Sequence, residues 1–278
     1  MRDPAPVRNL PGERCRALAT LVSDIDDTIT TAGMLPASTF QALWALDEAG
    51  VRTVLVTGRP AGWCDHIARM WPVAGVIGEN GALIYVYDRP QRRMRRTYLL
   101  GEEERREARR KLERIRERVL SEVPGCAIAN DQPFRLADLA VDFREDVGPL
   151  GPAEVREICR IMQSEGATYK VSSIHVNCWY GAFDKVAGLR RFLADEGRDL
   201  DDPRIRETLA FTGDSPNDEP LFQALETTIG VANILPFLPD LRHPPAFITK
   251  QEAAAGFAEA VEIILAKRGR RPVPRPPG

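Results

Sequence analysis

Two apolar, β-branched runs set the strongest limit on how this chain folds. Residues 19–23 and 51–57 each show the continuous apolar pattern of a strand that is buried on both faces. Between them, residues 40–49 carry a helical pattern, with Ser38 expected at the N-cap and Gly50 after the end. Two buried strands joined by about 30 residues with one helix form a βαβ unit. The chain is therefore expected to contain a parallel sheet covered by helices.

The alternation of strand and helix patterns continues, interrupted by a middle segment of different composition. Further apolar strand-like runs occur at residues 74–78, 208–212, 228–232 and 246–249. Further helices are expected after Pro60 and over residues 184–196 and 253–266. The middle segment is dense in charge, and its patterns predict strands at 136–143 and 169–177 and helices within 101–125 and at 153–163.

These patterns predict an α/β fold, with a Rossmann-like parallel-sheet core interrupted by an inserted α+β domain. The core is expected over residues 18–87 and 181–268, and the insertion over 88–180. Residues 1–17 are expected to form an N-terminal extension, and the polar, proline-rich residues 269–278 a disordered tail. Open parallel sheets bind ligands outside the carboxyl ends of their strands. The functional residues are therefore expected at that edge.

Charge and composition exclude several classes of partner. The 278 residues carry a net charge of −2, which argues against nucleic acid or a membrane surface as the main partner. No apolar run approaches the roughly 20 residues of a membrane-spanning helix, and the N-terminus lacks the apolar core of a signal peptide. The five cysteines show no spacing typical of zinc sites or disulfide frameworks. We expect a cytoplasmic protein, a monomer or homodimer, that acts on a small molecule.

Three carboxylates crowd the end of the first strand. In the stretch LVSDIDDTIT, Asp24, Asp26 and Asp27 directly follow the apolar run. Like charges at this spacing raise one another's pKa and destabilise the fold unless a cation or strong hydrogen bonds offset them. The stretch therefore predicts a bound cation.

Polar residues also follow the other buried strands, and the carboxyl ends of parallel strands meet at one edge of a sheet. The residues at these ends and in the first turn of a nearby helix are Thr57, Gly58, Arg59, Gly213, Asp214, Ser215, Asn217, Asp218 and Lys185. Together they offer carboxylates, a hydroxyl group and a cation. This set fits phosphoryl transfer, in which the negative charge of the phosphate must be offset by a metal ion and a lysine.

The carboxylates suggest a two-step reaction. Asp24 would attack phosphorus to form an aspartyl-phosphate. Asp26 would protonate the leaving alcohol and then deprotonate the attacking water. Asp24 and Asp214 would bind Mg²⁺, which prefers oxygen ligands.

The remaining residues would support these steps. Thr57 would hydrogen-bond the transferring group, and Lys185 would neutralise it. Ser215, Asn217 and Asp218 would form an outer layer that orients the lysine or the metal-bound water.

These motifs, in this order, resemble those of the haloacid dehalogenase-like phosphatase superfamily. The similar segments are DIDDT at 24–28, TGR at 57–59, Lys185 and GDSPND at 213–218. ENGA at 79–82 and the long insertion resemble the Cof-type branch of that superfamily, near the sucrose-phosphatase and mannosyl-3-phosphoglycerate phosphatase relatives. The resemblance covers most of residues 18–266.

The resemblance implies a cap of the C2B type that closes over the active site, and phosphorylated sugars or similar small metabolites as substrates. It implies Asp24 as the nucleophile, and Asp24, the backbone carbonyl of Asp26 and Asp214 as Mg²⁺ ligands. Two positions depart from the family. Asp27, interpreted as a solvated cap residue, stands where the family often has glycine, and Val186 stands where glycine commonly follows the lysine. Lys170 is a competing lysine, but it lies within a predicted strand of the insertion.

Several other residues have both a functional and a structural interpretation. Arg59 is either a surface residue or a contact to the substrate phosphate. Asn80 and Gly81 form a dipeptide typical of hairpin turns, and they are also candidates for facing the substrate. His175 and Asn177 share one face of a predicted strand, where they either reach the substrate from the rim of the cap or are satisfied polar groups.

The sequence thus predicts a Mg²⁺-dependent phosphomonoesterase that acts on a small phosphate ester, with sugar phosphates favoured by the resemblance. A phosphomutase of the same fold would use the same residues. A phospho-accepting signalling module also needs clustered aspartates, a threonine and a lysine, but it has no use for a general acid at Asp26 or for a large insertion. The exact substrate depends on side chains of the insertion whose directions the sequence does not give.

Overall fold

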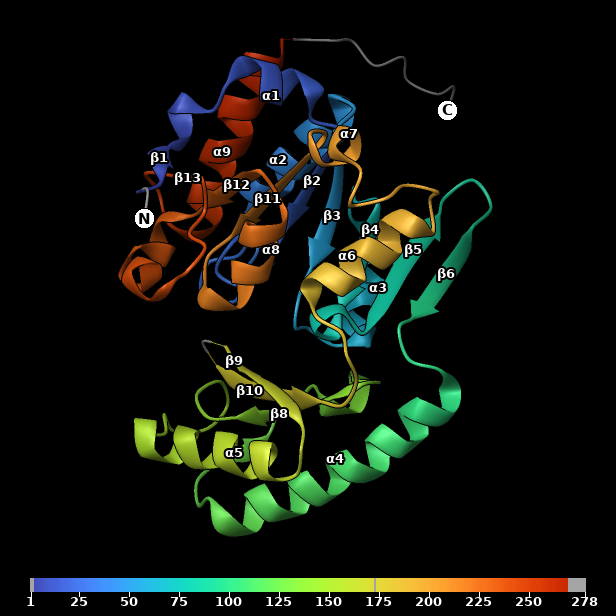
Figure 1. Cartoon of the computed structure of the whole chain (residues 1–278), viewed down its shortest axis with the longest axis vertical. Coiled ribbons are helices and arrows are strands. Elements are labelled where there is room, and N and C mark those ends of the chain that lie inside the picture. Colours follow the sequence, from blue (N-terminus) through green and yellow to red (C-terminus); the bar gives the residue numbers. More distant parts are fainter. Residues whose placement is uncertain (1–2, 173, 270–278) are drawn as a thin grey trace.

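The computed structural model describes residues 3–172 and 174–269, which form two sheets with helices around them (Figure 1). The larger sheet has nine strands in the order β1-β13-β12-β11-β2-β3-β4-β5-β6. Neighbouring strands are parallel from β1 to β4 in this order, whereas β5 and β6 are antiparallel to their neighbours. The predicted α/β class with a parallel-sheet core is confirmed.

The strands of the larger sheet are short, and most are buried. They are β1 (Ala5–Pro6), β2 (Thr20–Ser23), β3 (Arg52–Val56), β4 (Gly75–Gly78), β5 (Leu83–Asp88), β6 (Arg93–Tyr98), β11 (Leu209–Gly213), β12 (Thr227–Gly230) and β13 (Phe247–Ile248).

Helices cover both faces of this sheet because its central strands are apolar on both sides. The helices of one face are α1 (Gly12–Ala17), α2 (Ala37–Glu48), α3 (Ala61–Met70) and α9 (Ala253–Arg268). Those of the other are α6 (Lys185–Ala194) and α8 (Glu219–Ala224), and the short α7 (Pro203–Arg206) precedes β11. Leu21 of β2 packs on the face covered by α2 and α9, and Val22 packs on the face covered by α6 and α8, since successive side chains of a strand point to opposite faces.

The parallel register brings the ends of three strands together. Ser23 of β2 is aligned with Leu55 of β3 on one side and with Thr212 of β11 on the other. A chain of buried hydroxyl groups strengthens this edge. Thr212 Oγ1 donates to Ser23 Oγ at 2.7 Å, and Ser23 Oγ donates to the carbonyl of Asp24 at 2.8 Å. The segments that follow β2, β3 and β11 therefore meet at the carboxyl edge of the sheet.

Residues 101–180, here called the insertion, build a smaller unit with its own sheet and core. Its antiparallel sheet has the order β7 (Ala127–Ile128), β8 (Asp138–Asp142), β10 (His175–Trp179), β9 (Thr168–Val171). The helices α4 (Glu102–Glu122) and α5 (Pro152–Ser164) pack on one face of that sheet through apolar side chains such as Ile115 and Ile158. The other face is turned toward the larger sheet (Figure 1).

One predicted strand of the insertion is in fact a hairpin. Residues 169–177 were expected to form one alternating strand, but β9 and β10 pair antiparallel with a turn between them. The side chain of Ser172 favours this turn, because its Oγ accepts from the backbone N–H of His175 and donates to the carbonyl of the same residue, both at 3.0 Å. The sequence pattern gives no sign of the turn, because the apolar and polar alternation continues through Ser172.

Boundaries of the core also differ from the prediction. The expected start of the insertion at residue 88 divides a hairpin, since β6 pairs with β5 in the larger sheet. The sequence of β6, RMRRTY, is too charged to show an apolar strand pattern. The expected N-terminal extension contributes β1 to the edge of the sheet, where β1 pairs with β13. Helix α2 begins at Ala37 with Pro36 as its N-cap, so Ser38 lies in the first turn.

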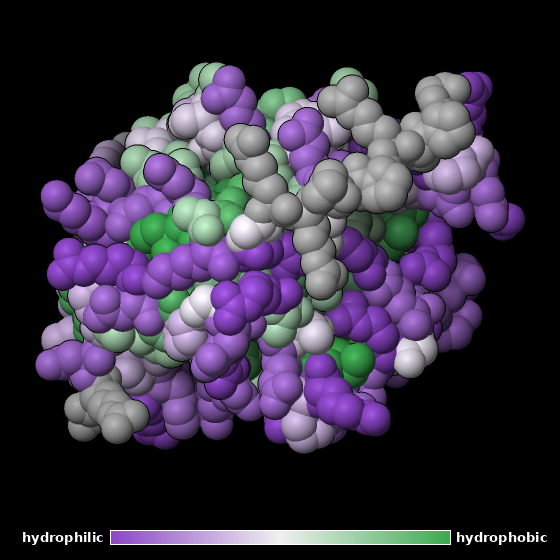
Figure 2. Space-filling model, turned by 90° about the horizontal axis from the view of Figure 1, so that it is seen from above, coloured by the Kyte–Doolittle hydropathy of each residue, from purple (hydrophilic) through white to green (hydrophobic). Residues whose placement is uncertain are grey.

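The face of the molecule seen from the side of α1 is mainly hydrophilic (Figure 2). Figure 2, seen from the side of α1, shows hydrophilic residues over most of that face with separate hydrophobic patches between them. Among the described residues, no helix is long and apolar enough to cross a membrane. Residues 270–278 of the predicted tail lie outside the described residues.

Candidate active site

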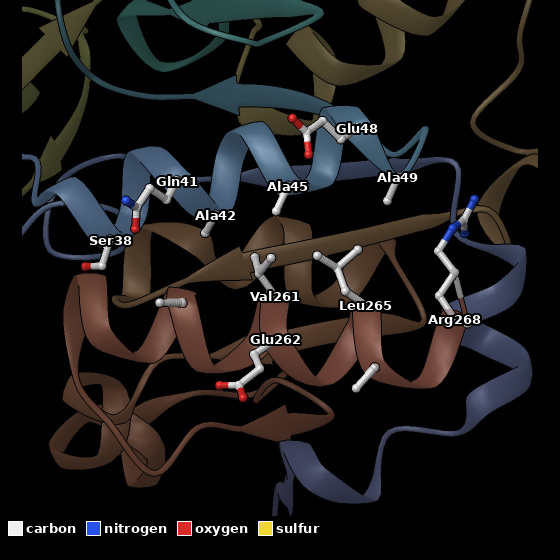
Figure 3. Close-up of a pocket in the computed structure, with 13 residues that line it drawn as sticks. Ser38, Gln41, Ala42, Ala45, Glu48, Ala49, Val261, Glu262, Leu265 and Arg268 are labelled. Atoms are coloured by element: carbon white, nitrogen blue, oxygen red, sulfur yellow. The ribbon is translucent and has the colours of Figure 1, made fainter. Parts of the chain in front are cut away.

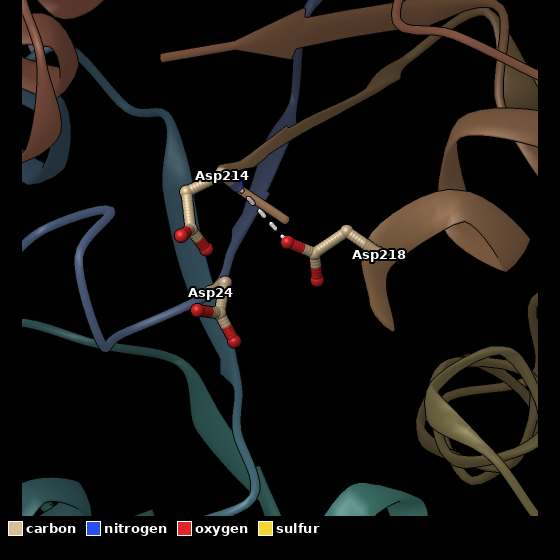
Figure 4. Close-up of side chains that lie close together, drawn as sticks. All are labelled: Asp24, Asp214 and Asp218. Atoms are coloured by element: carbon tan, nitrogen blue, oxygen red, sulfur yellow. Dashed lines mark hydrogen bonds between the residues drawn. The ribbon is translucent and has the colours of Figure 1, made fainter. Parts of the chain in front are cut away.

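Three aspartates gather at the carboxyl edge of the larger sheet. Asp24 follows β2, and Asp214 and Asp218 lie in and after the turn that follows β11 (Figure 4). One carboxylate oxygen of each lies within 4.8 Å of the others, which is close enough for a shared metal ion. Asp24 and Asp214 were predicted as metal ligands, and the structure brings them together.

Lys185, in the first turn of α6, provides the positive charge of the cluster. Its Nζ donates to Asp24 Oδ1 and to Asp218 Oδ1, both at 2.7 Å, and to Asn217 Oδ1 at 3.3 Å. The side chain is only 4% exposed, so these bonds form in a poorly solvated environment. The predicted choice of Lys185 over Lys170 therefore agrees with the geometry at Asp24.

Asp218, predicted as an outer residue, contacts both Lys185 and the loop after β11. Its Oδ1 accepts from Lys185, and its Oδ2 accepts from the backbone N–H of Asp214 at 3.0 Å and of Ser215 at 3.4 Å. Ser215 Oγ in turn donates to Asn217 Oδ1 at 3.0 Å. Asp218 thus holds Lys185 and the loop in place, and Asp24 and Asp214 remain the predicted ligands for a cation.

The negative charge of the cluster exceeds what Lys185 offsets. Burial, opposed by Lys185 and reinforced by Asp218 and Asp26, raises the pKa of Asp24 from 3.8 to about 7. Burial, with the neighbouring Asp218 and Asp24, raises the pKa of Asp214 well above its usual value. Burial alone would lower the pKa of Lys185, but the Asp218 and Asp24 carboxylates outweigh it and raise this pKa. Two oxygen ligands with excess negative charge fit a hard divalent cation such as Mg²⁺.

The side chain of Asp26 points away from this cluster and pairs with Arg59. Arg59 Nε lies 3.0 and 3.1 Å from the two Asp26 carboxylate oxygens, and Nη2 lies 2.9 Å from Oδ1. The Arg59 guanidinium also lies over the ring of Trp63, 4.5 Å from its centroid. Arg59 is therefore a buried partner of Asp26, which makes the surface interpretation of Arg59 wrong. Whether the backbone carbonyl of Asp26 binds a metal stays a prediction.

A cavity of about 550 Å³ joins the aspartate cluster to the insertion. Of the residues predicted for catalysis and binding, those that line it are Asp24, Asp26, Gly58, Arg59, Asn80, His175, Asn177, Asp214, Ser215 and Asn217. His175 and Asn177 come from β10, on the face of the insertion that is turned toward the core. Thr57 is fully buried, and its Oγ1 accepts from the Arg59 backbone N–H at 3.0 Å.

The ENGA segment has a different role at each position. Asn80 lines the cavity, with its side-chain amide packed over Gly58, and it has a left-handed φ of 56°. Gly81 does not reach the cavity, so its predicted contact to substrate is wrong. With φ at 107°, it packs so tightly against α6 that a Cβ there would lie 2.0 Å from the carbonyl oxygen of Asp184. Gly81 thus allows the first turn of α6, and with it Lys185, to approach the sheet.

Glu79 is a buried contact between core and insertion that sequence reasoning missed. Its carboxylate accepts from the backbone N–H of Ala61 at 3.0 Å in the core, and of Leu136 at 2.9 Å and Ala137 at 2.5 Å in the insertion. Burial, together with nearby Asp138, raises its pKa to about 7. A glutamate beside Asn-Gly gives no local sign of this role, because its partners lie far along the chain.

Two charged residues of the insertion, Arg135 and Glu145, complete the contact with the core, and neither was predicted. Arg135 Nη1 donates to the carbonyl of Gly58 at 2.9 Å and to the Asp138 carboxylate, while Nε and Nη2 donate to Asp131. Glu145 lies 3.4 Å from Arg59 Nη1, and its other oxygen lies 2.9 Å from Nε2 of His175. Burial lowers the pKa of His175, although Glu145 opposes this shift.

Asn233 is a further residue at the edge of the aspartate cluster that the sequence did not reveal. Its Nδ2 donates to Asp214 Oδ2 at 3.2 Å and to the carbonyl of Asp27 at 3.0 Å, and its Oδ1 accepts from the N–H of Ala253. It follows β12 and therefore belongs to the same edge of the sheet. An asparagine that follows a strand is a weak signal on its own. Asn233, however, follows a fourth parallel strand, and this position indicates that it lies at the same edge.

A larger cavity of about 770 Å³ lies between α2 and α9 (Figure 3). Side chains such as Ala42, Ala45, Val261 and Leu265 line it, together with Glu48 and Glu262 on opposite helices. None of the predicted site residues lines it. Because it offers no cluster of groups suited to chemistry, the smaller cavity at the strand ends is the candidate active site.

Comparisons with known proteins agree with these features. Residues 21–114 match the model of a family described as haloacid dehalogenase-like hydrolase. No curated protein matches the chain.

Solved structures share the fold at low sequence identity. A protein from Thermoplasma acidophilum aligns with a TM-score of 0.68 at 15% identity, over 89% of this chain and 98% of its own. A haloacid dehalogenase-like hydrolase from B. subtilis gives 0.64 at 14%, over 89% and 100%. The sucrose-phosphatase from Synechocystis, solved with sucrose and phosphate, gives 0.60 at 16%, over 90% and 98%. The alignments include the insertion, since they span most of both chains.

Proposed function

We propose that this haloacid dehalogenase-like hydrolase is a Mg²⁺-dependent phosphomonoesterase that acts on a small phosphate ester through an aspartyl-phosphate. The observation that carries the proposal is the buried pairing of Asp24 with Lys185 beside Asp214, at the floor of a cavity that the insertion covers. The sucrose-phosphatase with the same fold supports a phosphorylated sugar or similar metabolite as the substrate.

The charged groups at the floor of the cavity suit the first displacement. Asp24 attacks phosphorus, and Lys185, held between Asp24 and Asp218, offsets the charge that the phosphate brings near the carboxylate. Mg²⁺ held by Asp24 and Asp214 would offset the remaining charge when bound. Thr57, which directly follows β3, would donate its hydroxyl proton to the transferring group.

Asp26 would transfer a proton to the leaving group. It lines the cavity but lies outside the aspartate cluster, so it faces the substrate without competing for the cation. Arg59 fixes the orientation of its carboxylate through three close contacts. The insertion, which meets the core at Glu79 and Arg135, limits the access of bulk water to this site.

The proposal is tested by phosphate release from a panel of sugar phosphates and other small esters, with Mg²⁺ or with EDTA. We expect release with Mg²⁺ and none with EDTA. Chromatography of the products distinguishes a phosphomutase, which would yield an isomeric sugar phosphate without free phosphate. No release and no isomer from any ester would contradict both, and it would leave a phospho-accepting module as the better account of the aspartates.

A pH-dependent effect of Mg²⁺ on stability follows from the pKa of Asp24. This pKa is about 7 in the folded, metal-free protein against 3.8 ordinarily, so the folded state keeps a proton that the unfolded state releases between these values. The contribution of Asp24 to stability is therefore present at low pH and is lost as the pH rises toward 7. Because Mg²⁺ binds the carboxylate form, we expect it to raise Tm more at about pH 8 than at about pH 5.5.

Differential scanning fluorimetry with and without Mg²⁺ measures this difference. The Asp24→Asn variant is the control, since it lacks the titrating group and should show a smaller Mg²⁺ effect that varies less with pH. An equal rise in Tm at both pH values in the wild type would contradict the assignment of Asp24 as a ligand.

A further inference from the structure

We infer that the alcohol part of the substrate carries a second anionic group, a carboxylate or another phosphate, and that Lys170 of the insertion binds it. This inference rests on the proposed function, because it concerns the specificity of the same cavity.

The position of Lys170 follows from the register of the sheet in the insertion. Lys170 of β9 lies opposite Asn177 of β10, and Asn177 lies opposite Ala140 of β8. Directly opposed residues share one face of a sheet, so Lys170 belongs to the same face as Asn177. That face is turned toward the core (Figure 1), and both residues line the cavity. Lys170 therefore forms part of the wall that faces the aspartate cluster.

The other cations of the site already have anionic partners. Arg59 pairs with Asp26, Arg135 with Asp131 and Asp138, and Lys185 with Asp24 and Asp218. By contrast, the ammonium group of Lys170 has no hydrogen bond or ion pair with any residue in the ranges 3–172 and 174–269. Among the described residues that line the cavity, Lys170 is therefore the cation that remains available to a ligand.

The transferring phosphate does not need this charge. It would bind at the floor of the cavity, beside Asp24, where Lys185 supplies the positive charge. Lys170 is on the opposite wall, which comes from the insertion, so it meets the part of the substrate that leaves. An anionic group there gains a charge-assisted hydrogen bond that a neutral sugar hydroxyl does not provide to the same degree.

Glu252 of the core is an alternative partner for Lys170. Glu252 also lines the cavity, and its carboxylate has no side-chain partner among the residues that the structure describes. If the insertion moved so that Lys170 met Glu252, the lysine would act in closure, and its loss would affect every substrate alike. A second anion on the substrate predicts instead a loss that depends on the substrate.

The experiment compares matched pairs of esters. Glycerol 3-phosphate and 3-phosphoglycerate differ by a carboxylate, and fructose 6-phosphate and fructose 1,6-bisphosphate by a second phosphate. We expect the wild type to prefer one of the esters that carry a second anionic group, and Lys170→Met to lower kcat/KM for that ester by about 10- to 100-fold. The matched ester without the second anionic group should change little, and Lys170→Arg should keep part of the preference. Lys250→Met, which alters an exposed lysine outside the cavity, is the matched control.

Two results would overturn the inference. The first is a wild type that prefers neither of the esters with a second anionic group. The second is a Lys170→Met variant in which kcat/KM falls equally for both members of a pair. If no ester is hydrolysed, the proposed function fails, and the charge inference is then decided by calorimetric binding of 3-phosphoglycerate and fructose 1,6-bisphosphate to the Asp24→Asn protein. Binding weakened by Lys170→Met supports the inference, and binding that is absent or unchanged overturns it.

Discussion

The Asp24→Asn substitution is expected to reduce phosphate release by about 10⁴-fold or more, because it removes the nucleophile and one of two candidate metal ligands. Asparagine has nearly the same shape, and its amide oxygen still accepts from Lys185. Since the Asp24 carboxylate is buried and its pKa is raised to about 7, removal of its charge should not lower the stability of the metal-free protein at pH 8.

The measurement combines steady-state phosphate release with thermal unfolding. Asp240→Asn, which alters an exposed aspartate that does not line the cavity, is the matched control and should behave as wild type. Activity of Asp24→Asn within tenfold of the wild type would contradict the proposed role, provided that mass spectrometry shows no deamidation back to aspartate.

Replacing Lys185 by Met is expected to have the largest effect on stability. It leaves the carboxylates of Asp24 and Asp218 buried without their shared cation, and breaking a buried pair in this way costs about 3 to 5 kcal/mol. The loss should be larger at pH 8 than at low pH, because removal of Lys185 raises the pKa of Asp24 further and a protonated Asp24 needs no cation. Phosphate release should also fall strongly.

Urea unfolding at the two pH values, without metal, measures this loss. The Lys185→Met/Asp218→Asn double variant is informative, since removing one of the two charges should recover part of the stability. Lys250→Met again serves as the control for loss of a lysine. A Lys185→Met protein as stable as the wild type at pH 8 would show that the aspartates do not depend on this lysine.

The aspartate cluster at the strand ends could be predicted because its residues directly follow strands that the sequence pattern identifies. Each of β2, β3 and β11 is an apolar run followed directly by polar residues, and parallel strands bring such ends to one edge. Asp24 and Asp214 therefore follow from the chain order of strands and turns. Lys185 follows from its place in the first turn of a helix that packs near the same edge.

The contacts between core and insertion could not be predicted in this way. Arg59 bonds to Glu145, and Glu79 to the backbone of Leu136, across separations of 86 and 57 residues. Such contacts depend on how the two units meet, which no periodicity encodes. The hairpin at Ser172 was missed for the opposite reason, because a regular alternation continued through a turn.

The backbone conformation of Asp27 explains why glycine is often found at this position in the family that the motifs resemble. Its φ is 54°, in the left-handed region that glycine adopts without cost and that aspartate tolerates better than most residues. The glycine often found at this position in the family is thus explained by the backbone. The residue does not need a catalytic role for this explanation.

The measurement that tests the central claim most directly is the detection of a phosphoryl group on Asp24 during turnover. The Asp26→Asn variant, in which hydrolysis of the intermediate lacks its base, is mixed with Mg²⁺ and the best ester, quenched in acid, digested and analysed by mass spectrometry. The proposed mechanism predicts a phosphorylated peptide that contains Asp24. Phosphate release with the label absent, or located on another residue, would contradict it.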